Sequence, residues 1–111
     1  MDCLFCKIIE GKIPAKIVHE TDKVLAFLDI NPQAKFHALV IPRKHIERVG
    51  KMDASDSALI GELIYQAKII AEKNGQQDYR LVFNNGPEAG QTVFHVHLHV
   101  LAGRRMTWPP G

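Results

Sequence analysis

Three histidines alternate with apolar residues near the C-terminal end of the chain, at His95, His97 and His99. Strong strand formers stand between and around them: Phe94, Val96, Leu98 and Val100. Because successive side chains of a β-strand point to opposite faces, this spacing predicts a strand with the histidines on one face and apolar side chains on the other. The chain has six histidines, and three on one face favour a chemical role over a half-exposed strand that carries histidines by chance.

The geometry of a strand limits what these three side chains could do together. Neighbouring residues on one face lie ~6.6 Å apart, whereas zinc–nitrogen bonds are about 2.0–2.1 Å long. The three rings are therefore not expected to meet on a single metal ion. A larger ligand, for example a phosphate, could contact His97 and His99 together, and His95 would then be available for a second role.

The two cysteines of the chain, Cys3 and Cys6, are separated by two residues. In a reducing compartment this spacing is more typical of a metal-binding or redox pair than of a structural disulfide. A thioredoxin-like redox pair is disfavoured, because no βαβ pattern surrounds the cysteines. Zinc with four ligands would need two more side chains. His95, which has no other role so far, and His45 are the candidates.

Length and composition exclude several classes of protein. The chain has 111 residues, the size of one domain, and a formal net charge of +2 with acidic and basic residues interspersed. The longest basic cluster, within residues 43–48, is too short for a nucleic-acid interface. No apolar run has the length of a membrane span, and residues 1–7 lack the pattern of a signal peptide. We expect a cytoplasmic protein that binds neither nucleic acid nor membrane.

The elements that must position these residues follow from the apolar pattern and the turn residues. Strands are expected over residues 17–20, 24–28, 37–41 and 79–83, in addition to the histidine segment. A short helix is expected to begin at an Asp2 cap and to end at Gly11. A long helix is expected after Asp53, which with Asp56 resembles a capping box, and it should end at residues 74–75. Most strand connections are too short for parallel crossovers, so we expect an α+β fold with a five-stranded antiparallel sheet.

The segment from Gly90 to Val100, Gly-Gln-Thr-Val-Phe-His-Val-His-Leu-His-Val, resembles the signature of the histidine triad (HIT) superfamily. Residues 29–34, residues 37–46 and the Trp-Pro-Pro-Gly ending resemble the Hint branch, the purine nucleoside phosphoramidases. The similarity covers nearly the whole chain, and the ending is specific to that branch. The resemblance implies one HIT domain over residues 1–111 and a homodimer with a continuous ten-stranded sheet. It also implies binding of purine nucleotides such as AMP and cleavage of bonds to the adenylyl phosphorus.

The resemblance assigns catalytic roles to four residues. His97 matches the nucleophile, His99 the residue that binds a phosphate oxygen, and His37 the fourth family histidine, which supports the triad. A neutral imidazole is a competent nucleophile near pH 7, and a nucleotidyl-imidazole formed by attack at phosphorus could be cleaved by water. Thr92 stands near the leaving group, where the branch commonly has Ser. Taken alone, Thr92 could equally be an ordinary strand residue.

Further residues are assigned to the substrate by the same resemblance. The Asp29 carboxylate could accept hydrogen bonds from both ribose hydroxyls. Without the resemblance, Asp29 would be interpreted as a turn-capping residue. Asn84 and Gly90 match active-site positions in a loop whose backbone N–H groups could face the phosphate. The tail carrying Trp108 would cross to the active site of the partner subunit. Four residues that otherwise read as core would form the slot for the base: Phe5, Ile8, Phe27 and Ile30.

The resemblance also bears on the metal. Some HIT proteins with an N-terminal Cys-x-x-Cys bind zinc through the positions of Cys3, Cys6, His45 and His95, whereas others in the Hint branch lack both cysteines and metal. We therefore predict a structural zinc site and no metal requirement for catalysis.

Three other functions remain open at this stage. Dinucleoside polyphosphate hydrolysis, known from another branch, is disfavoured by the Trp-Pro-Pro-Gly ending. A nucleotide-binding interaction module with incidental hydrolysis is disfavoured by the complete set of histidines. A catalytic zinc hydrolase using His95, His97 and another histidine would lose its activity on chelation.

Overall fold

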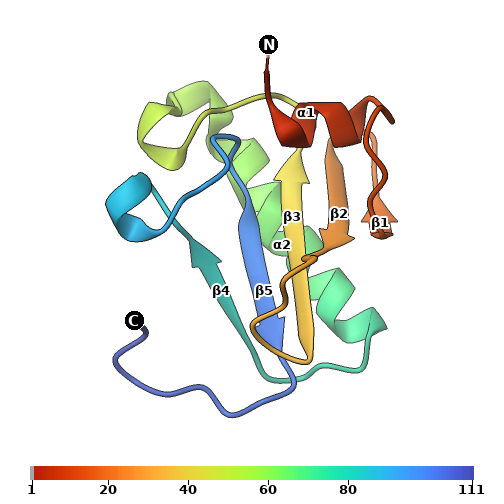
Figure 1. Cartoon of the computed structure of the whole chain (residues 1–111), viewed down its shortest axis with the longest axis vertical. Coiled ribbons are helices and arrows are strands. Elements are labelled where there is room, and N and C mark those ends of the chain that lie inside the picture. Colours follow the sequence, from red (N-terminus) through yellow and green to blue (C-terminus); the bar gives the residue numbers. More distant parts are fainter. Residues whose placement is uncertain (1) are drawn as a thin grey trace.

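One antiparallel sheet of five strands runs through the centre of the computed structural model, which describes residues 2–111 (Figure 1). Its strands are β1 (Ile17–Glu20), β2 (Val24–Leu28), β3 (Phe36–Pro42), β4 (Tyr79–Phe83) and β5 (Leu98–Ala102). They lie in the order β1-β2-β3-β5-β4, and every neighbouring pair is antiparallel. The predicted α+β fold with a five-stranded antiparallel sheet is confirmed.

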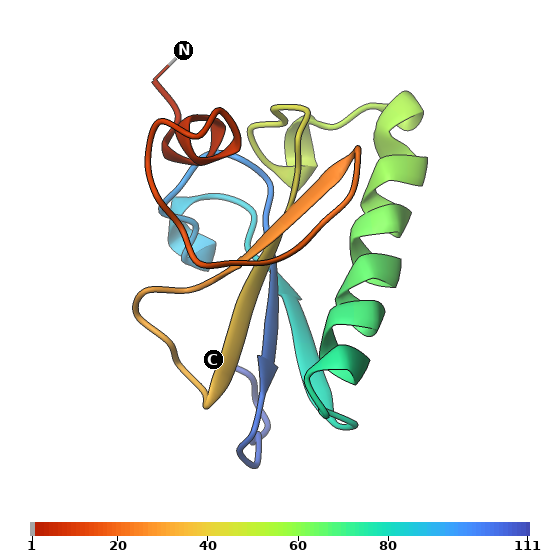
Figure 2. The same ribbon diagram turned by 90° about the vertical axis from the view of Figure 1, so that its right-hand side faces the viewer.

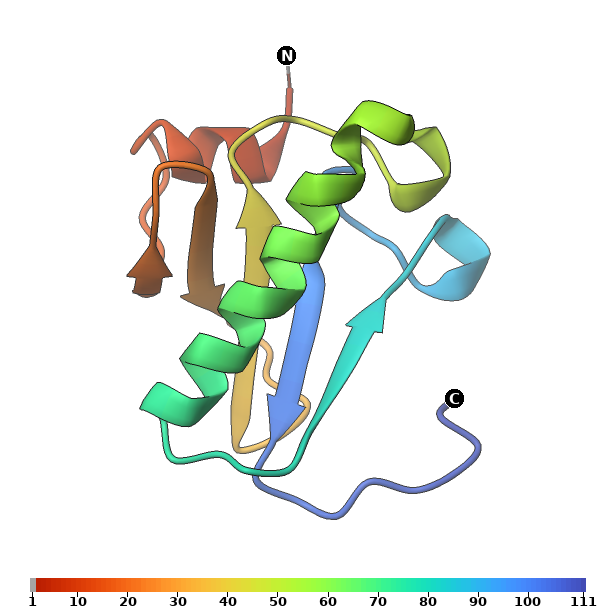
Figure 3. The same cartoon turned by 180° about the vertical axis from the view of Figure 1, so that it is seen from behind.

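The two helices cover opposite faces of this sheet, as Figure 2 shows. The long helix α2 (Ser57–Lys73) crosses one face, seen from behind in Figure 3, and the short helix α1 (Leu4–Ile9) lies over the other. Alternate residues of β2 and β3 therefore enter two cores. The core beneath α2 includes Val24, Ala26, Ala38, Val40, Leu63, Ala67, Ile70 and Ala71. The core beneath α1 includes Phe5, Ile8, Leu25, Phe27, Leu39 and Ile41. No helix within residues 2–111 is long and apolar enough to cross a membrane.

The ends of the helices mostly follow the predicted signals. Asp53 and Asp56 form the capping box, which caps the N-terminal end of a 3₁₀ turn directly before α2. Asn74 caps the other end of α2, and Gly75 follows with a φ of 73°. The predicted cap of α1 is wrong by one residue: Cys3, not Asp2, is the N-cap, and its Sγ accepts a hydrogen bond from the Cys6 N–H. Asp2 instead pairs with the exposed side chain of Lys7.

The strand that carries the histidines is shorter than predicted. β5 begins at Leu98, so only His99 of the three histidines lies within it. If the pairing of β3 with β5 continued, Pro42 would stand opposite Val96, but proline has no N–H to donate to a sheet. The Val96 N–H instead donates to the Ile46 carbonyl at 2.7 Å.

The alternation of faces nevertheless extends beyond the strand itself. Val96, Leu98 and Val100 are buried in the core beneath α2. On the opposite face, the ring centroids of His97 and His99 are 5.0 Å apart. The predicted separation of apolar and imidazole side chains therefore holds for residues 96–100, although only part of this segment is hydrogen-bonded as a strand.

Candidate active site and metal centre

A cavity of about 340 Å³ opens between α1, the end of β2 and the histidine segment. Its walls include both His97 and His99, together with Asp29 and Thr92. All four residues predicted to form an apolar slot also line it: Phe5, Ile8, Phe27 and Ile30. The structure thus brings eight predicted residues to one cavity with a mainly apolar lining. Sequence reasoning did not identify several other apolar residues of the lining: Leu4, Ile13, Pro14, Ala15, Leu28, Leu39 and Val93.

Hydrogen bonding determines which nitrogen of His97 carries the proton. The His97 Nδ1 lies 2.8 Å from the backbone carbonyl oxygen of His95. A carbonyl can only accept, so Nδ1 must donate and Nε2 keeps its lone pair. The ring is buried beside Phe5, and burial lowers the pKa of His97 below its ordinary value. His97 is therefore a neutral imidazole with an unprotonated Nε2, the form that a nucleophile needs.

The protonation of His99 is set by a chain of donors that starts at the main chain. The Gln33 N–H donates to His37 Nδ1 at 3.0 Å, so the proton of His37 lies on Nε2. This Nε2–H donates to His99 Nδ1 at 2.9 Å. His99 must then carry its own proton on Nε2, a buried atom with no hydrogen-bond partner within residues 2–111. Burial lowers the pKa of His99 to about 4, so the ring is neutral near pH 7.

The register of the sheet brings this pair of histidines together. His99 of β5 pairs with Leu39 of β3, and His37 pairs with Leu101. His37 and His99 are therefore diagonal neighbours on one face, a position from which side chains of adjacent strands can touch. Burial also lowers the pKa of His37, although the Asp29 carboxylate opposes this effect. His99, which lines the cavity, is thus hydrogen-bonded on the side away from the cavity to a second neutral histidine, His37.

Asp29 has the turn-capping contact that its position after β2 suggests. Its Oδ1 accepts a hydrogen bond from the Asn31 N–H at 2.8 Å, and its Oδ2 lies 3.5 Å from His37 Nε2. Donor atoms of Asp29, His37 and His99 all lie within 4.8 Å of one another. They do not form a good metal site, because His37 Nε2 carries the proton that it donates to His99.

Three predicted substrate residues do not line the cavity in this chain. Asn84 and Gly90 are neighbours, since a Cβ at Gly90 would lie 3.8 Å from Asn84 Nδ2, but neither belongs to the cavity wall. Trp108 is 81% exposed and also lies outside the wall. Asn84, Gly90 and Trp108 therefore lie outside the wall of this cavity within the single chain.

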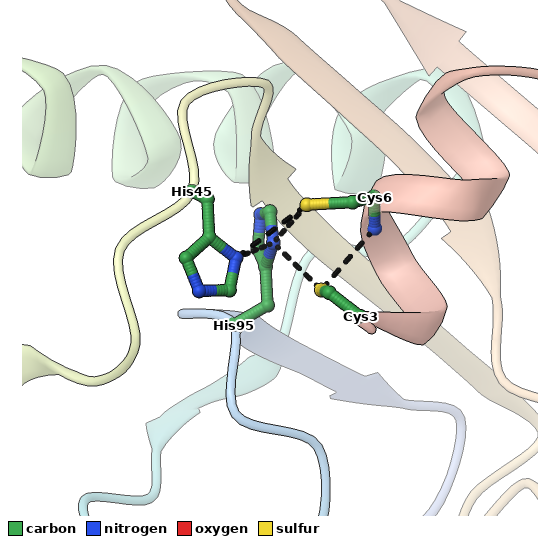
Figure 4. Close-up of side chains that lie close together, drawn as sticks. All are labelled: Cys3, Cys6, His45 and His95. Carbon is green, nitrogen blue, oxygen red and sulfur yellow. Dashed lines mark hydrogen bonds between the residues drawn. The ribbon is translucent and has the colours of Figure 1, made fainter. Parts of the chain in front are cut away.

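A second cluster joins the N-terminal cysteines to two histidines (Figure 4). His95 Nδ1 lies 3.4 Å from Cys3 Sγ, 3.6 Å from Cys6 Sγ and 3.2 Å from His45 Nδ1. Cys6 Sγ lies 3.5 Å from His45 Nδ1. A tetrahedral zinc ion with ordinary bond lengths separates its sulfur and nitrogen ligands by about 3.3–3.8 Å. These four of the six distances between the donor atoms are close to the edges of a zinc tetrahedron, and all four atoms lie within 4.8 Å of one another.

The protonation states of this cluster also suit a cation. The His95 Nε2–H donates to the Pro42 carbonyl at 2.8 Å, which leaves the lone pair on Nδ1 directed at the cysteines. Burial lowers the pKa of His95 to about 4, so the ring is neutral. Burial, reinforced by the adjacent Cys3, raises the pKa of the Cys6 thiol to about 11. A bound cation would reverse this last effect by stabilising the thiolates. The donor set is therefore compatible with zinc.

The two clusters divide the three histidines of the motif between them. His95 Nδ1 faces the cysteines, whereas His97 and His99 line the cavity. A catalytic zinc ion held by His95 and His97 together is therefore not supported by the geometry. The groups that fix the protons, namely the Gln33 N–H and the carbonyls of Pro42 and His95, were not predicted. They belong to the main chain, so no residue type signals them.

Comparison with known proteins places this fold and these residues in one family. The HIT domain family matches residues 10–106. An uncharacterized HIT-like protein from Synechocystis sp. is 52% identical over 111 residues, which cover 99% of this chain and 97% of that protein. A 14 kDa zinc-binding protein from Zea mays is 46% identical over 111 residues, 97% of this chain and 87% of that protein.

Solved structures give the same result. The crystal structure of a HIT family hydrolase from Legionella pneumophila is 50% identical, with a TM-score of 0.96 over 99% of this chain and 100% of that one. A histidine triad protein from Clostridium difficile is 39% identical, with a TM-score of 0.92 over 96% of this chain and 95% of that one. The chain therefore belongs to the HIT domain family and has the fold of its hydrolases.

Proposed function

We propose that this protein is a nucleotide-binding hydrolase of the Hint branch, which cleaves the P–N bond of purine nucleoside 5′-phosphoramidates. The observation that carries the proposal is the pairing of protonation states in one cavity. His97 has an unprotonated Nε2, and the neighbouring His99 has a buried Nε2–H without a partner within residues 2–111. One nitrogen is suited to attack phosphorus and the other to bind a phosphate oxygen. Membership of the HIT domain family supports the hydrolase class.

The reaction would proceed in two steps on His97. The lone pair of Nε2 attacks the α-phosphorus, the P–N bond breaks, and the amine leaves as it takes a proton from the surrounding water, which regains one when the second step consumes a water molecule. The resulting nucleotidyl-imidazole carries a positive charge, which the His95 carbonyl stabilises through its hydrogen bond with Nδ1–H. Water then attacks the same phosphorus, releasing the nucleoside monophosphate and restoring His97. His99 binds a phosphate oxygen, His37 holds the tautomer of His99, and Thr92 lies on the leaving-group side.

The rest of the proposed domain, residues 1–111, would bind the nucleotide and stabilise the fold. The apolar residues of the cavity wall would bind the purine base, and Asp29 in the same wall would bind the ribose. Cys3, Cys6, His45 and His95 would hold a structural zinc ion, a proposal supported by the zinc-binding relative from maize. No catalytic step uses this ion.

A steady-state assay across three substrate types would test the proposed reaction. Adenosine 5′-phosphoramidate and an AMP–lysine conjugate should be hydrolysed faster than a diadenosine polyphosphate, and a chelator should not remove the activity. Faster cleavage of the dinucleotide would place the protein in the other branch. Tight AMP binding with negligible turnover of all three would identify a nucleotide-binding module.

We predict that AMP binds more tightly than 2′-deoxy-AMP. The Asp29 carboxylate would lose one hydroxyl partner with the deoxy ligand, at about 1–3 kcal/mol, which corresponds to a Kd weaker by roughly 5- to 150-fold. Asp29→Asn is the matched variant, because an amide oxygen can still accept the hydrogen bond from the Asn31 N–H. Calorimetry should show a smaller preference in this variant. Equal affinities of the wild type for the two ligands would contradict the role of Asp29.

We also propose a homodimer in which β4 of each subunit pairs to extend the sheet to ten strands. β4 lies at an edge of the sheet, where strands have unpaired N–H and C=O groups. The adjacent helix α2 exposes Ile64 and Tyr65, which are 45% and 55% exposed. The tail with Trp108 would reach the partner subunit's cavity and influence the choice of leaving group.

Light scattering at micromolar concentration should report a dimer. Ile64→Glu should weaken it by placing a charge in the interface, whereas Ile17→Glu on the opposite edge strand β1 should not. Ile17 is a suitable control because it is 48% exposed, nearly the same fraction as Ile64. A wild-type monomer at this concentration would refute the proposed assembly.

A further inference from the structure

Gln91 is a buried polar residue that has no part in the reaction described above. Only 3% of its surface is exposed, although glutamine is usually a surface residue. Its Oε1 accepts a hydrogen bond from the Gly86 N–H at 2.9 Å. Its Nε2 donates to the carbonyls of Glu47 at 2.9 Å and Val93 at 3.1 Å. Both hydrogens of the amide are therefore used, as is its oxygen.

These three hydrogen bonds join the connection between β4 and β5, at Gly86 and Val93, to the segment after β3, at Glu47. Gly86 belongs to the loop between β4 and β5, and its φ of 93° suits glycine. The Gln91 N–H also donates to the Gly86 carbonyl at 3.1 Å, which closes the loop a second time. Glu47 follows His45, and Val93 follows Thr92 in the cavity wall. One side chain thus fixes the loop, the segment after β3 and the wall beside His97.

We propose that Gln91 is a positioning residue, which holds Thr92 in the wall of the cavity so that the substrate phosphorus meets His97 with its leaving group toward Thr92. This inference rests on the proposed function. Gln91 does not line the cavity, so it acts through the residues that it holds. The apolar slot and Asp29 come from α1, β2 and the segments that follow these elements, and none of the three side-chain hydrogen bonds of Gln91 goes to them. Loss of Gln91 should therefore impair turnover without impairing nucleotide binding.

Two substitutions separate this role from general stability. Gln91→Glu keeps the shape of the side chain, but its carboxylate has no hydrogen to donate and would face the carbonyl oxygens of Glu47 and Val93. Gln91→Met fills similar space without a charge and loses all three hydrogen bonds. Gln77→Glu is the matched control, because this glutamine is exposed and remote from the cavity.

The experiment measures kcat, KM and the AMP Kd of each folded variant with adenosine 5′-phosphoramidate. The Gln91 variants should lose at least tenfold in kcat with an AMP Kd within threefold of wild type, and Gln77→Glu should match wild type. In a Thr92→Val background, Gln91→Met should lower kcat by no more than threefold, because the hydroxyl that it positions is already absent. If the glutamate variant does not fold, the uncharged methionine variant decides the test.

The contrary outcomes are distinct. A loss of kcat smaller than tenfold, or a change in AMP Kd above threefold, would overturn the positioning role. It would also be overturned if the fold losses in kcat of Gln91→Met and Thr92→Val multiply in the double variant. If the wild type and the Gln91 variants hydrolyse the phosphoramidate equally well, this inference is refuted and the proposed function stands. A wild-type protein that does not hydrolyse the phosphoramidate would refute the proposed function, and this inference with it.

Discussion

His97→Ala should abolish steady-state release of amine from nucleoside phosphoramidates while AMP binding persists. A covalent mechanism has no alternative nucleophile at neutral pH once the imidazole is removed, so turnover should fall to background. The apolar slot, Asp29 and His99 remain in the cavity of this variant. The AMP Kd should therefore stay within about tenfold of wild type, ~1.4 kcal/mol.

His99→Ala and His37→Ala provide the comparison for this variant. Each should retain more activity than His97→Ala, because each removes a group that binds or orients and leaves the proposed nucleophile in place. Amine release and calorimetry with AMP measure the two properties separately. Substantial activity in His97→Ala, combined with its loss in either of the others, would show that a different histidine attacks phosphorus.

Cys3→Ser should reduce thermal stability strongly and leave measurable chemistry. A structural zinc ion contributes its binding free energy to folding, so loss of one thiolate ligand should lower Tm on the order of 10 °C. Elemental analysis of the purified, unchelated wild type should find one zinc ion per chain. A chelator should lower the Tm of wild type toward that of Cys3→Ser and have little effect on the variant. Wild-type protein without zinc, or with a Tm insensitive to chelation, would contradict the metal site.

Local sequence pattern predicts most elements of this chain because alternation, helical spacing and caps are properties of short segments. β1, β2 and β4 coincide with the predicted ranges, and Asp53 forms its capping box. The start of β5 is different, because it depends on two groups from distant segments. Pro42 offers no N–H to Val96, and the Ile46 carbonyl takes the Val96 N–H instead. The cap of α1 is displaced for a local reason: the Cys3 thiol accepts a hydrogen bond from the Cys6 N–H, although cysteine is not among the usual N-cap residues.

The side chains of the candidate site could be predicted from residue types and family resemblance, whereas the directions of their hydrogen bonds could not. The proton on His37 is placed by the Gln33 N–H, and the proton on His97 is placed by the His95 carbonyl. Main-chain groups are present at every position, so only the fold shows which of them are aimed at a ring. Gln91 stands within the recognised motif, but its burial and its hydrogen bond to the distant Glu47 carbonyl are visible only in the structure.

Side chains of residues 96–100 alternate between two faces. The fold and the cavity therefore depend on the number of residues in this segment as much as on their identity. Val96, Leu98 and Val100 complete the core beneath α2, while His97 and His99 complete the cavity wall. Deletion of a single residue here would exchange the two sets, so that imidazoles would enter the core and aliphatic side chains would face the nucleotide. Substitutions can damage the fold or the chemistry separately, but a change in length would damage both at once. We therefore expect this segment to tolerate single substitutions better than any insertion or deletion, which only the loops outside it should accommodate.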